Sequence, residues 1–139
     1  MNTPANGLRT PARGNLGPLA DREPNELVSE VEELGIDWAN ADEVASLAEE
    51  TKKTLLAQFT VEYQKGSSAV GAKPMSMANA EALALADPRY SAHLENMVKA
   101  RTQANRLRVR YDSGRVKIDL LRSLIATRRE EARLSSFRS

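Results

Sequence analysis

The amino-acid sequence predicts an all-α protein: an elongated helical bundle or coiled coil with one long basic C-terminal helix and a disordered N-terminal arm. Three observations lead to this prediction. Aromatic residues make up only 4% of the 139 residues and charged residues 28%, a balance typical of helices that pack along narrow apolar seams. Apolar side chains recur at spacings of three and four residues over much of the chain. Finally, no proline occurs after Pro88, so one helix can extend almost to the end.

Residues 1–24 are predicted to form the disordered arm. They hold four of the six prolines and three of the seven glycines and show no apolar periodicity.

Residues 25–64 are predicted to be an acidic helical segment of two helices. Leu27, Val31 and Leu34 predict a short first helix that ends at Gly35 as a C-cap. Asn40 is the predicted N-cap of a second helix to about Gln64, with this apolar face: Val44, Leu47, Thr51, Leu55, Phe59 and Tyr63.

Residues 65–75 are predicted to be a linker because of their glycine, serine and proline content. Residues 76–139 then comprise a short helix capped by Ser76 and the long basic helix. Asp87 and Pro88 predict the start of the long helix, which can run to about Leu134. Gly114 is the one glycine within it, and the sequence leaves open a kink, a break into a hairpin or a close crossing of two helices.

A heptad repeat in the long helix predicts a coiled-coil seam that mediates self-association. Placing Met97 at position a puts apolar or small residues at successive a and d positions. The predicted oligomer seam comprises Met97, Ala104, Leu107, Tyr111, Gly114, Ile118, Leu121 and Ile125, with Ala100 and Ala132 in the same register. Because short helices cannot cover such a seam fully, we expect a homo-oligomer.

In the same register every e position from residue 101 to residue 129 is arginine: Arg101, Arg108, Arg115, Arg122 and Arg129. Two interpretations remain open. The arginines can pair with carboxylates of the acidic segment, for which Glu43, Glu49, Glu50 and Glu62 are candidates. Alternatively, they can bind the phosphates of a nucleic acid. Both interpretations can hold if the acidic segment covers the arginines in the free protein and the nucleic acid displaces it. The predicted nucleic-acid-binding residues are Arg101, Arg106, Arg108, Arg110, Tyr111, Arg115, Lys117, Arg122 and Arg129.

Tyr111 belongs to both predicted sets. An aromatic ring among arginines can stack on a base of single-stranded nucleic acid, whereas a residue at a seam position packs in the core.

The charge distribution supports a basic binding face at the C-terminal end. Residues 1–88 hold 7 Lys and Arg against 14 Asp and Glu, and residues 89–139 hold 13 against 5.

The residues from Asn105 to Arg115, NRLRVRYDSGR, resemble the basic segment of the UvsY-type recombination mediators of bacteriophages. The chain departs from that family in its proline-rich arm and in the regular heptads after Arg115. The resemblance implies an oligomeric helical protein that binds single-stranded DNA and helps to load a recombinase, with a recombinase or a single-strand-binding protein as partner. It also implies a phage protein in the cytoplasm of a bacterial host cell.

The sequence offers little for catalysis. It has no cysteine and a single histidine, His93, so a thiolate zinc site, a cysteine nucleophile or a histidine-based triad has too few residues. We therefore expect no enzyme, no metal and no cofactor. No leader and no membrane-spanning segment are expected either, because no long apolar run occurs. The alternatives to the DNA-binding accessory protein are a protein-binding adaptor or inhibitor, such as a phage regulator of a host machine, and a structural coiled-coil component.

Overall fold

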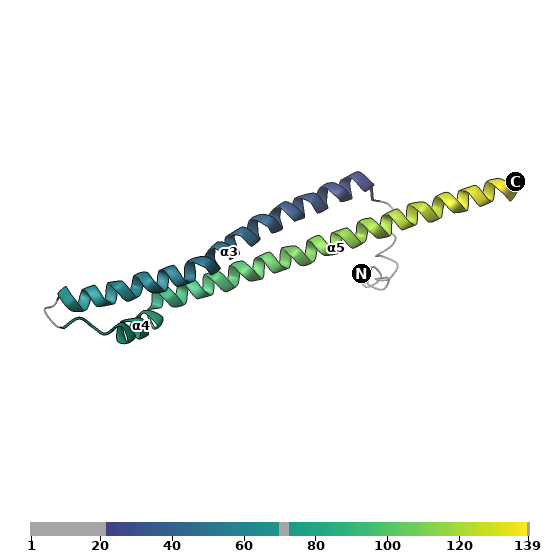
Figure 1. Ribbon diagram of the computed structural model, residues 1–139. Helices are drawn as coiled ribbons and strands as arrows, with labels where there is room; N and C mark the ends of the chain where they lie inside the picture. Colours follow the sequence, from purple (N-terminus) through teal and green to yellow (C-terminus); the bar gives the residue numbers. More distant parts are fainter. Residues whose placement is uncertain (1–21, 70–72, 139) are drawn as a thin grey trace, which may run out of the picture. The chain divides into compact units, whose positions relative to one another are not determined.

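A computed structural model describes residues 22–69 and 73–138, which form three helices (Figure 1). Helix α3 spans Pro24–Ala69, α4 spans Met77–Leu85 and α5 spans Pro88–Arg138. No strand occurs in these two described stretches, so the prediction of an all-α fold is confirmed. The predicted arm, up to residue 21, and residues 70–72 of the predicted linker lie outside the described residues.

Helix α3 is a single helix of 46 residues, so the prediction of two helices is wrong. Gly35 and Asn40, the predicted C-cap and N-cap, both lie inside it. Gly35 faces the ring of Tyr111 on α5, and a β-carbon at this position would lie 3.0 Å from Cε1 of that ring. The glycine therefore serves close packing between two helices. Helix α3 also continues to Ala69, well into the predicted linker.

The less exposed side of α3 also differs from the predicted apolar face. Val44 and Leu47 are each 61% exposed, whereas Ala45 is fully buried. The buried and half-buried positions follow one another at spacings of three and four residues: Leu27, Val31, Leu34, Trp38, Ala41, Ala45, Ala48, Lys52, Leu55 and Phe59. This is a heptad pattern, and it continues through Gly35. It was missed because alanines and one lysine occupy its middle, while the larger apolar residues there lie on the exposed side.

Two predicted helix starts are confirmed. Ser76 is the N-cap of α4, and its side chain accepts a hydrogen bond from the backbone N–H of Asn79 at 3.2 Å. Asp87 precedes α5, and its Oδ1 accepts a hydrogen bond from the backbone N–H of Arg89 at 2.8 Å. Both contacts satisfy N–H groups that have no partner within their own helix. Helix α5 then continues without interruption through Gly114.

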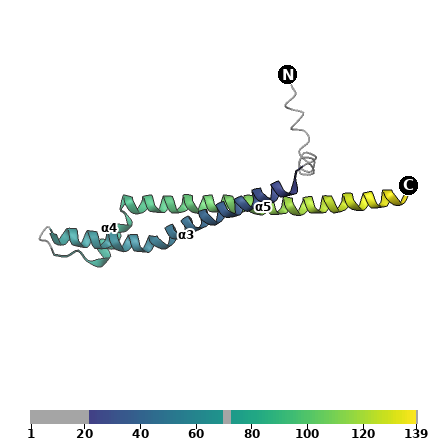
Figure 2. The same cartoon turned by 90° about the horizontal axis from the view of Figure 1, so that it is seen from above.

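The described chain divides into two compact units. One unit contains residues 22–36 and 108–138, and the other contains residues 37–107. In the first unit α3 and α5 run antiparallel, because Val31 lies against Gly114 and Gly35 lies against Tyr111. Leu27 and Leu121 form the core of this unit, with Ile118 and Ile125 packed against them. Every residue from 126 to 138 is exposed, because α3 begins only at Pro24 (Figures 1 and 2).

The second unit has its core where α4 meets the two long helices. Phe59, Ala84 and Tyr90 are buried there, and the surrounding half-buried residues are Leu55, Leu56, Tyr63 and Leu94. The Arg89 guanidinium stands 4.2 Å from the centre of the Phe59 ring. All three helices contribute to this core, α4 through the small residue Ala84, which allows it to pack closely against its neighbours.

Asp87 is a buried polar anchor beside this core. It is 5% exposed and accepts hydrogen bonds from the Tyr63 hydroxyl at 2.8 Å and from the Arg89 guanidinium at 2.9 and 3.1 Å. Arg89 also donates to Glu62 at 2.7 Å. The hydrogen bonds from Arg89 hold the pKa of Asp87 well below its usual range. A buried carboxylate with this many donors ties the start of α5 to the end of α3.

The predicted oligomer seam is the covered side of α5. Ala104, Leu107, Gly114 and Leu121 are buried, and Met97, Ala100, Tyr111, Ile118 and Ile125 are half-buried. In the unit of residues 22–36 and 108–138, α3 of the same chain covers this side. The expectation that one chain has only short helices for this purpose is therefore wrong. An oligomer contact through these residues would require α3 to move away.

Candidate nucleic-acid interface on helix α5

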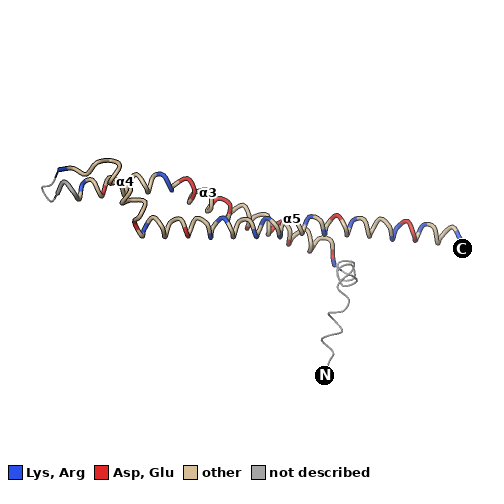
Figure 3. The backbone as a smooth tube through the Cα atoms, turned by 90° about the horizontal axis from the view of Figure 1, so that it is seen from below, with Lys and Arg blue, Asp and Glu red and all other residues tan. Residues whose placement is uncertain are grey.

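Four of the five e-position arginines are exposed: Arg108, Arg115, Arg122 and Arg129. Position e directly adjoins the seam, so the backbone of the helix holds Arg108, Arg115 and Arg122 at the edge of the surface that faces α3, whereas Arg129 lies in the exposed stretch after it. They recur every seven residues, about 10.5 Å along the helix axis. Figure 3 shows further Lys and Arg positions along α5, with few carboxylates between them.

Arg101, the fifth arginine, is bound within the chain. Its guanidinium contacts Oδ1 of Asp42 at 2.6 Å and both carboxylate oxygens of Glu49 at 2.7 and 2.9 Å. A third α3 side chain, Ser46, accepts a hydrogen bond at 3.2 Å. These hydrogen bonds raise the pKa of Arg101 and lower that of Glu49. The predicted pairing with the acidic segment thus holds for this arginine, and we leave Arg101 out of the candidate interface.

The other predicted carboxylate partners do not reach the arginine row. Glu62 binds Arg89 instead, and neither Glu43 nor Glu50 forms an ion pair with a described residue. Asp42, which the sequence reasoning missed, is the closer partner of Arg101. The available signal was its spacing of seven residues from Glu49, which puts both carboxylates on one side of α3.

The remaining cationic residues of the predicted nucleic-acid interface form weak ion pairs or none with the described residues. Arg108 and Arg122 contact Asp112 and Asp119 on their own helix at 3.9 Å, with all four side chains more than half exposed. Ion pairs of this kind contribute little to stability and are easily exchanged for another anion. Within the described part of the chain, no carboxylate forms an ion pair with these cations: Arg106, Arg110, Arg115, Lys117 and Arg129.

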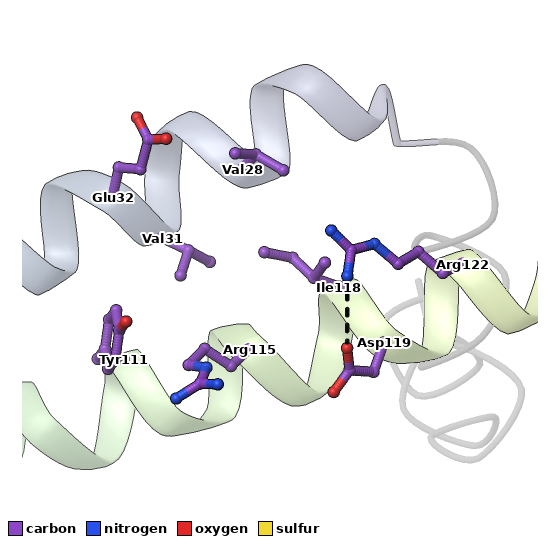
Figure 4. A pocket seen from close by; sticks show the side chains of 8 residues that line it. All are labelled: Val28, Val31, Glu32, Tyr111, Arg115, Ile118, Asp119 and Arg122. Carbon is purple, nitrogen blue, oxygen red and sulfur yellow. Dashed lines mark ion pairs between the residues drawn. The ribbon is translucent and has the colours of Figure 1, made fainter.

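A shallow pocket of about 250 Å³ adjoins the arginine row, between α3 and α5 in the unit of residues 22–36 and 108–138 (Figure 4). Val31 and Ile118 point into the space between the helices, while Arg115 and Arg122 extend from α5. The guanidinium of Arg115 lies 5.9 Å from the centre of the Tyr111 ring. The complete lining is Val28, Val31, Glu32, Tyr111, Arg115, Ile118, Asp119 and Arg122.

The structure therefore brings together three of the predicted nucleic-acid-binding residues, Tyr111, Arg115 and Arg122, around one pocket. Arg108 and Arg129 continue the row on either side along α5. Arg110 and Lys117 occupy g positions, on the other edge of the seam, and Arg106 occupies a c position on the opposite side of the helix. The nine predicted residues thus do not form one stripe. The sequence did not indicate that apolar side chains of α3 line this pocket, because Val28 and Val31 are far from α5 in the sequence.

His93 is half-buried, and its Nε2 lies 2.8 Å from the backbone oxygen of Ala48 on α3. No group of three or more His, Asp or Glu side chains in residues 22–69 and 73–138 is arranged to hold a metal ion. The same residues contain no helix that is both long and apolar enough to cross a membrane.

No protein-family model matches the chain, and neither a curated protein nor a solved structure shows significant similarity to it.

Proposed function

We propose that this protein is a non-enzymatic accessory protein that binds single-stranded DNA along the e-position arginines of α5. The observation that carries the proposal is the row Arg108, Arg115, Arg122 and Arg129, exposed and without a strong carboxylate partner among the described residues. Arginine donates paired hydrogen bonds to phosphate, and phosphate binding releases counterions from the nucleic acid. The binding of a polyanion to a row of exposed guanidinium groups is therefore favourable.

The pocket beside Tyr111 adds a reason to favour a single strand over a duplex. Apolar side chains from both helices, among them Val31 and Ile118, line part of it, and Arg115 and Arg122 line it as well (Figure 4). A flat base can enter such a pocket and contact its apolar side chains only when the base is unpaired. Glu32 and Asp119 also line the pocket and repel phosphate, so the phosphates are expected along the arginine row and the base inside the pocket.

The biological setting of the proposal rests on the UvsY-type resemblance of residues 105–115. We propose that the protein acts in phage recombination or replication and helps to load a recombinase, with the recombinase or a single-strand-binding protein as partner.

A titration of labelled single-stranded DNA, followed by fluorescence anisotropy at two salt concentrations, tests the proposal. The variant Arg108→Glu with Arg115→Glu should bind much more weakly. Each lost phosphate contact should also flatten the slope of log affinity against log salt by roughly 0.7. The matched control is Lys53→Glu with Lys65→Glu, which changes the net charge equally at two exposed positions of α3. Equal losses for both variants would show that net charge alone drives binding and would contradict a specific interface.

A protein-binding adaptor or inhibitor is the alternative. It is favoured by the exposed carboxylates along α3, among them Glu33, Asp37, Glu43 and Glu50, which can imitate a polyanion. If the Arg108 and Arg115 variant binds DNA like the wild type, this alternative replaces the DNA-binding proposal.

A further inference from the structure

Helix α5 carries a second heptad stripe on the side opposite to the seam. Its members occupy positions c and f and recur at spacings of three and four residues: Val109, Ser113, Val116, Leu120, Ser123, Thr127, Glu130, Leu134 and Phe137. Every one of them is exposed, and five are large apolar residues. Val109 is 66% exposed, Val116 57% and Leu120 45%. We call residues 109–127 of this set the outer stripe.

The outer stripe lies in the unit of residues 22–36 and 108–138, where α3 covers the other side of α5. Val31 and Leu27 of α3 contact Gly114 and the region of Leu121, which are seam residues about 160° around the helix from the outer stripe. Nothing in the described part of this unit covers Val116 or Leu120. Apolar residues repeated with this spacing are typical of a helix that packs against another helix.

We propose that the outer stripe binds the outer stripe of a second copy of this chain, as a parallel two-stranded coiled coil. The charges at the two edges of the stripe indicate that its binding partner is an identical helix. Asp112 and Asp119 lie on one edge, at b positions, and Arg110 and Lys117 lie on the other, at g positions. All four side chains are exposed. One stripe therefore presents a negative and a positive edge, and each edge complements the opposite edge of an identical helix.

The direction of pairing follows from the same charges. In a parallel pair in register, a residue on one edge meets the residue five positions later on the opposite edge of the partner. Asp112 of each copy then meets Lys117 of the second copy, which gives two ion pairs related by symmetry. In an antiparallel pair like edges meet, so the aspartates of the two copies would face one another and repel. The contact between Asp112 and Arg108 at 3.9 Å is exposed and weak and does not compete with this pairing.

The pairing leaves the DNA-binding proposal intact and does not depend on it. The e-position arginines lie outside the contact between the two outer stripes, so a pair would present two arginine rows. Ser113, Ser123 and Thr127 place hydroxyl groups in the contact, which favours a reversible pair over a permanent one.

Disulfide trapping tests the register directly, because the chain contains no cysteine. In a parallel pair in register, Val116 of one copy lies opposite Val116 of the other. The variant Val116→Cys should therefore form a disulfide-linked dimer under mild oxidation of the full chain. The matched control is Arg115→Cys, the adjacent exposed residue, whose side chain points away from the contact. Equal trapping of both variants, or no trapping at position 116, would overturn the proposal.

Charge exchange tests the ion pair independently by sedimentation equilibrium. Asp112→Lys alone and Lys117→Asp alone should each weaken the dimer, by roughly tenfold in Kd, because like charges then face each other at two symmetric places. The double variant Asp112→Lys with Lys117→Asp should restore the wild-type Kd. Circular dichroism verifies that the exposed substitutions leave the helices intact. A wild-type chain that stays monomeric at about 100 µM (a dimer Kd well above 100 µM, weaker than about −5.5 kcal/mol), or a double variant as weak as the singles, would overturn the proposal.

Discussion

Gly114 of α5 lies directly against Val31 of α3, so closely that a β-carbon on the glycine would stand 2.6 Å from Cγ2 of the valine. Four residues further along α3, Gly35 lies against the ring of Tyr111, three residues before Gly114 on α5. Each helix thus places a glycine where the other presents a bulky side chain. The two antiparallel helices can approach closely here because neither glycine has a side chain.

The first prediction concerns this close approach. Gly114→Ala should destabilise the protein by about 1–2 kcal/mol, because the added methyl overlaps Val31, a β-branched residue with little rotamer freedom. Urea unfolding followed by circular dichroism measures the change. In the Val31→Ala background the same substitution should become stabilising, since the helix then gains up to about 1 kcal/mol from alanine.

Gly66→Ala is the matched control for this prediction. Gly66 is also helical, but a β-carbon there would meet nothing within 4 Å. This change should stabilise α3 slightly. A Gly114→Ala variant that is as stable as Gly66→Ala would contradict the close contact.

The second prediction tests the register of α3. Val44→Gln and Leu47→Gln should each change the free energy of unfolding by less than about 0.5 kcal/mol, because both side chains are mostly exposed. Ala45→Leu, one residue away from Val44, should cost about 1–3 kcal/mol, because Ala45 is fully buried and has no space for a larger side chain. The opposite ranking in thermal or urea unfolding would support the apolar face predicted from the sequence.

The third prediction concerns the pH dependence of stability. Hydrogen bonds from the side chain and backbone of Arg89, together with one from Tyr63, hold the pKa of Asp87 below its unfolded value. A group with a lowered pKa stabilises the fold fully above its unfolded pKa, and this contribution disappears as the pH falls toward the folded pKa. The free energy of unfolding should therefore decrease below about pH 4.

Glu30 and Glu49 have lowered pKa values and act in the same direction, so a variant is needed to isolate Asp87. Asp87→Asn should be less stable than the wild type at pH 7 and should lose less stability between pH 5 and pH 2. Parallel curves for the two proteins would show that Asp87 does not contribute to the acid sensitivity.

The fourth prediction separates the two kinds of arginine on α5. Arg101→Gln should lower the unfolding temperature, because it leaves Asp42 and Glu49 without their shared partner. Arg106→Gln, which removes an exposed cation without an ion pair in the described residues, should leave the unfolding temperature nearly unchanged. High salt should reduce the difference between the two variants, since the Arg101 contacts are partly exposed. Equal unfolding temperatures would mean that the Arg101 contacts add nothing to stability.

The sequence by itself determined the helical class, the start of α4 at Ser76, the start of α5 after Asp87 and the covered side of α5. These features depend on local chemistry: a capping side chain acts within one turn, and a heptad repeat is visible in a single helix. The exposed arginine row was also predictable, because position e always adjoins the seam. The pocket was not predictable, because its lining combines Val31 and Ile118 from helices far apart in the sequence.

Only the tertiary structure decided the roles of the two glycines and the partner of Arg101. A glycine in a helical pattern is compatible with a cap, a kink or a close crossing, and the choice depends on which side chain of the neighbouring helix faces it. Gly35 continues α3 because packing against Tyr111 outweighs its low helix propensity. In the same way, the sequence did not distinguish the five e-position arginines, because all five carry the same charge at the same heptad position. Arg101 differs because Asp42 and Glu49 lie one heptad apart on the helix beside it, so both carboxylates reach the same guanidinium.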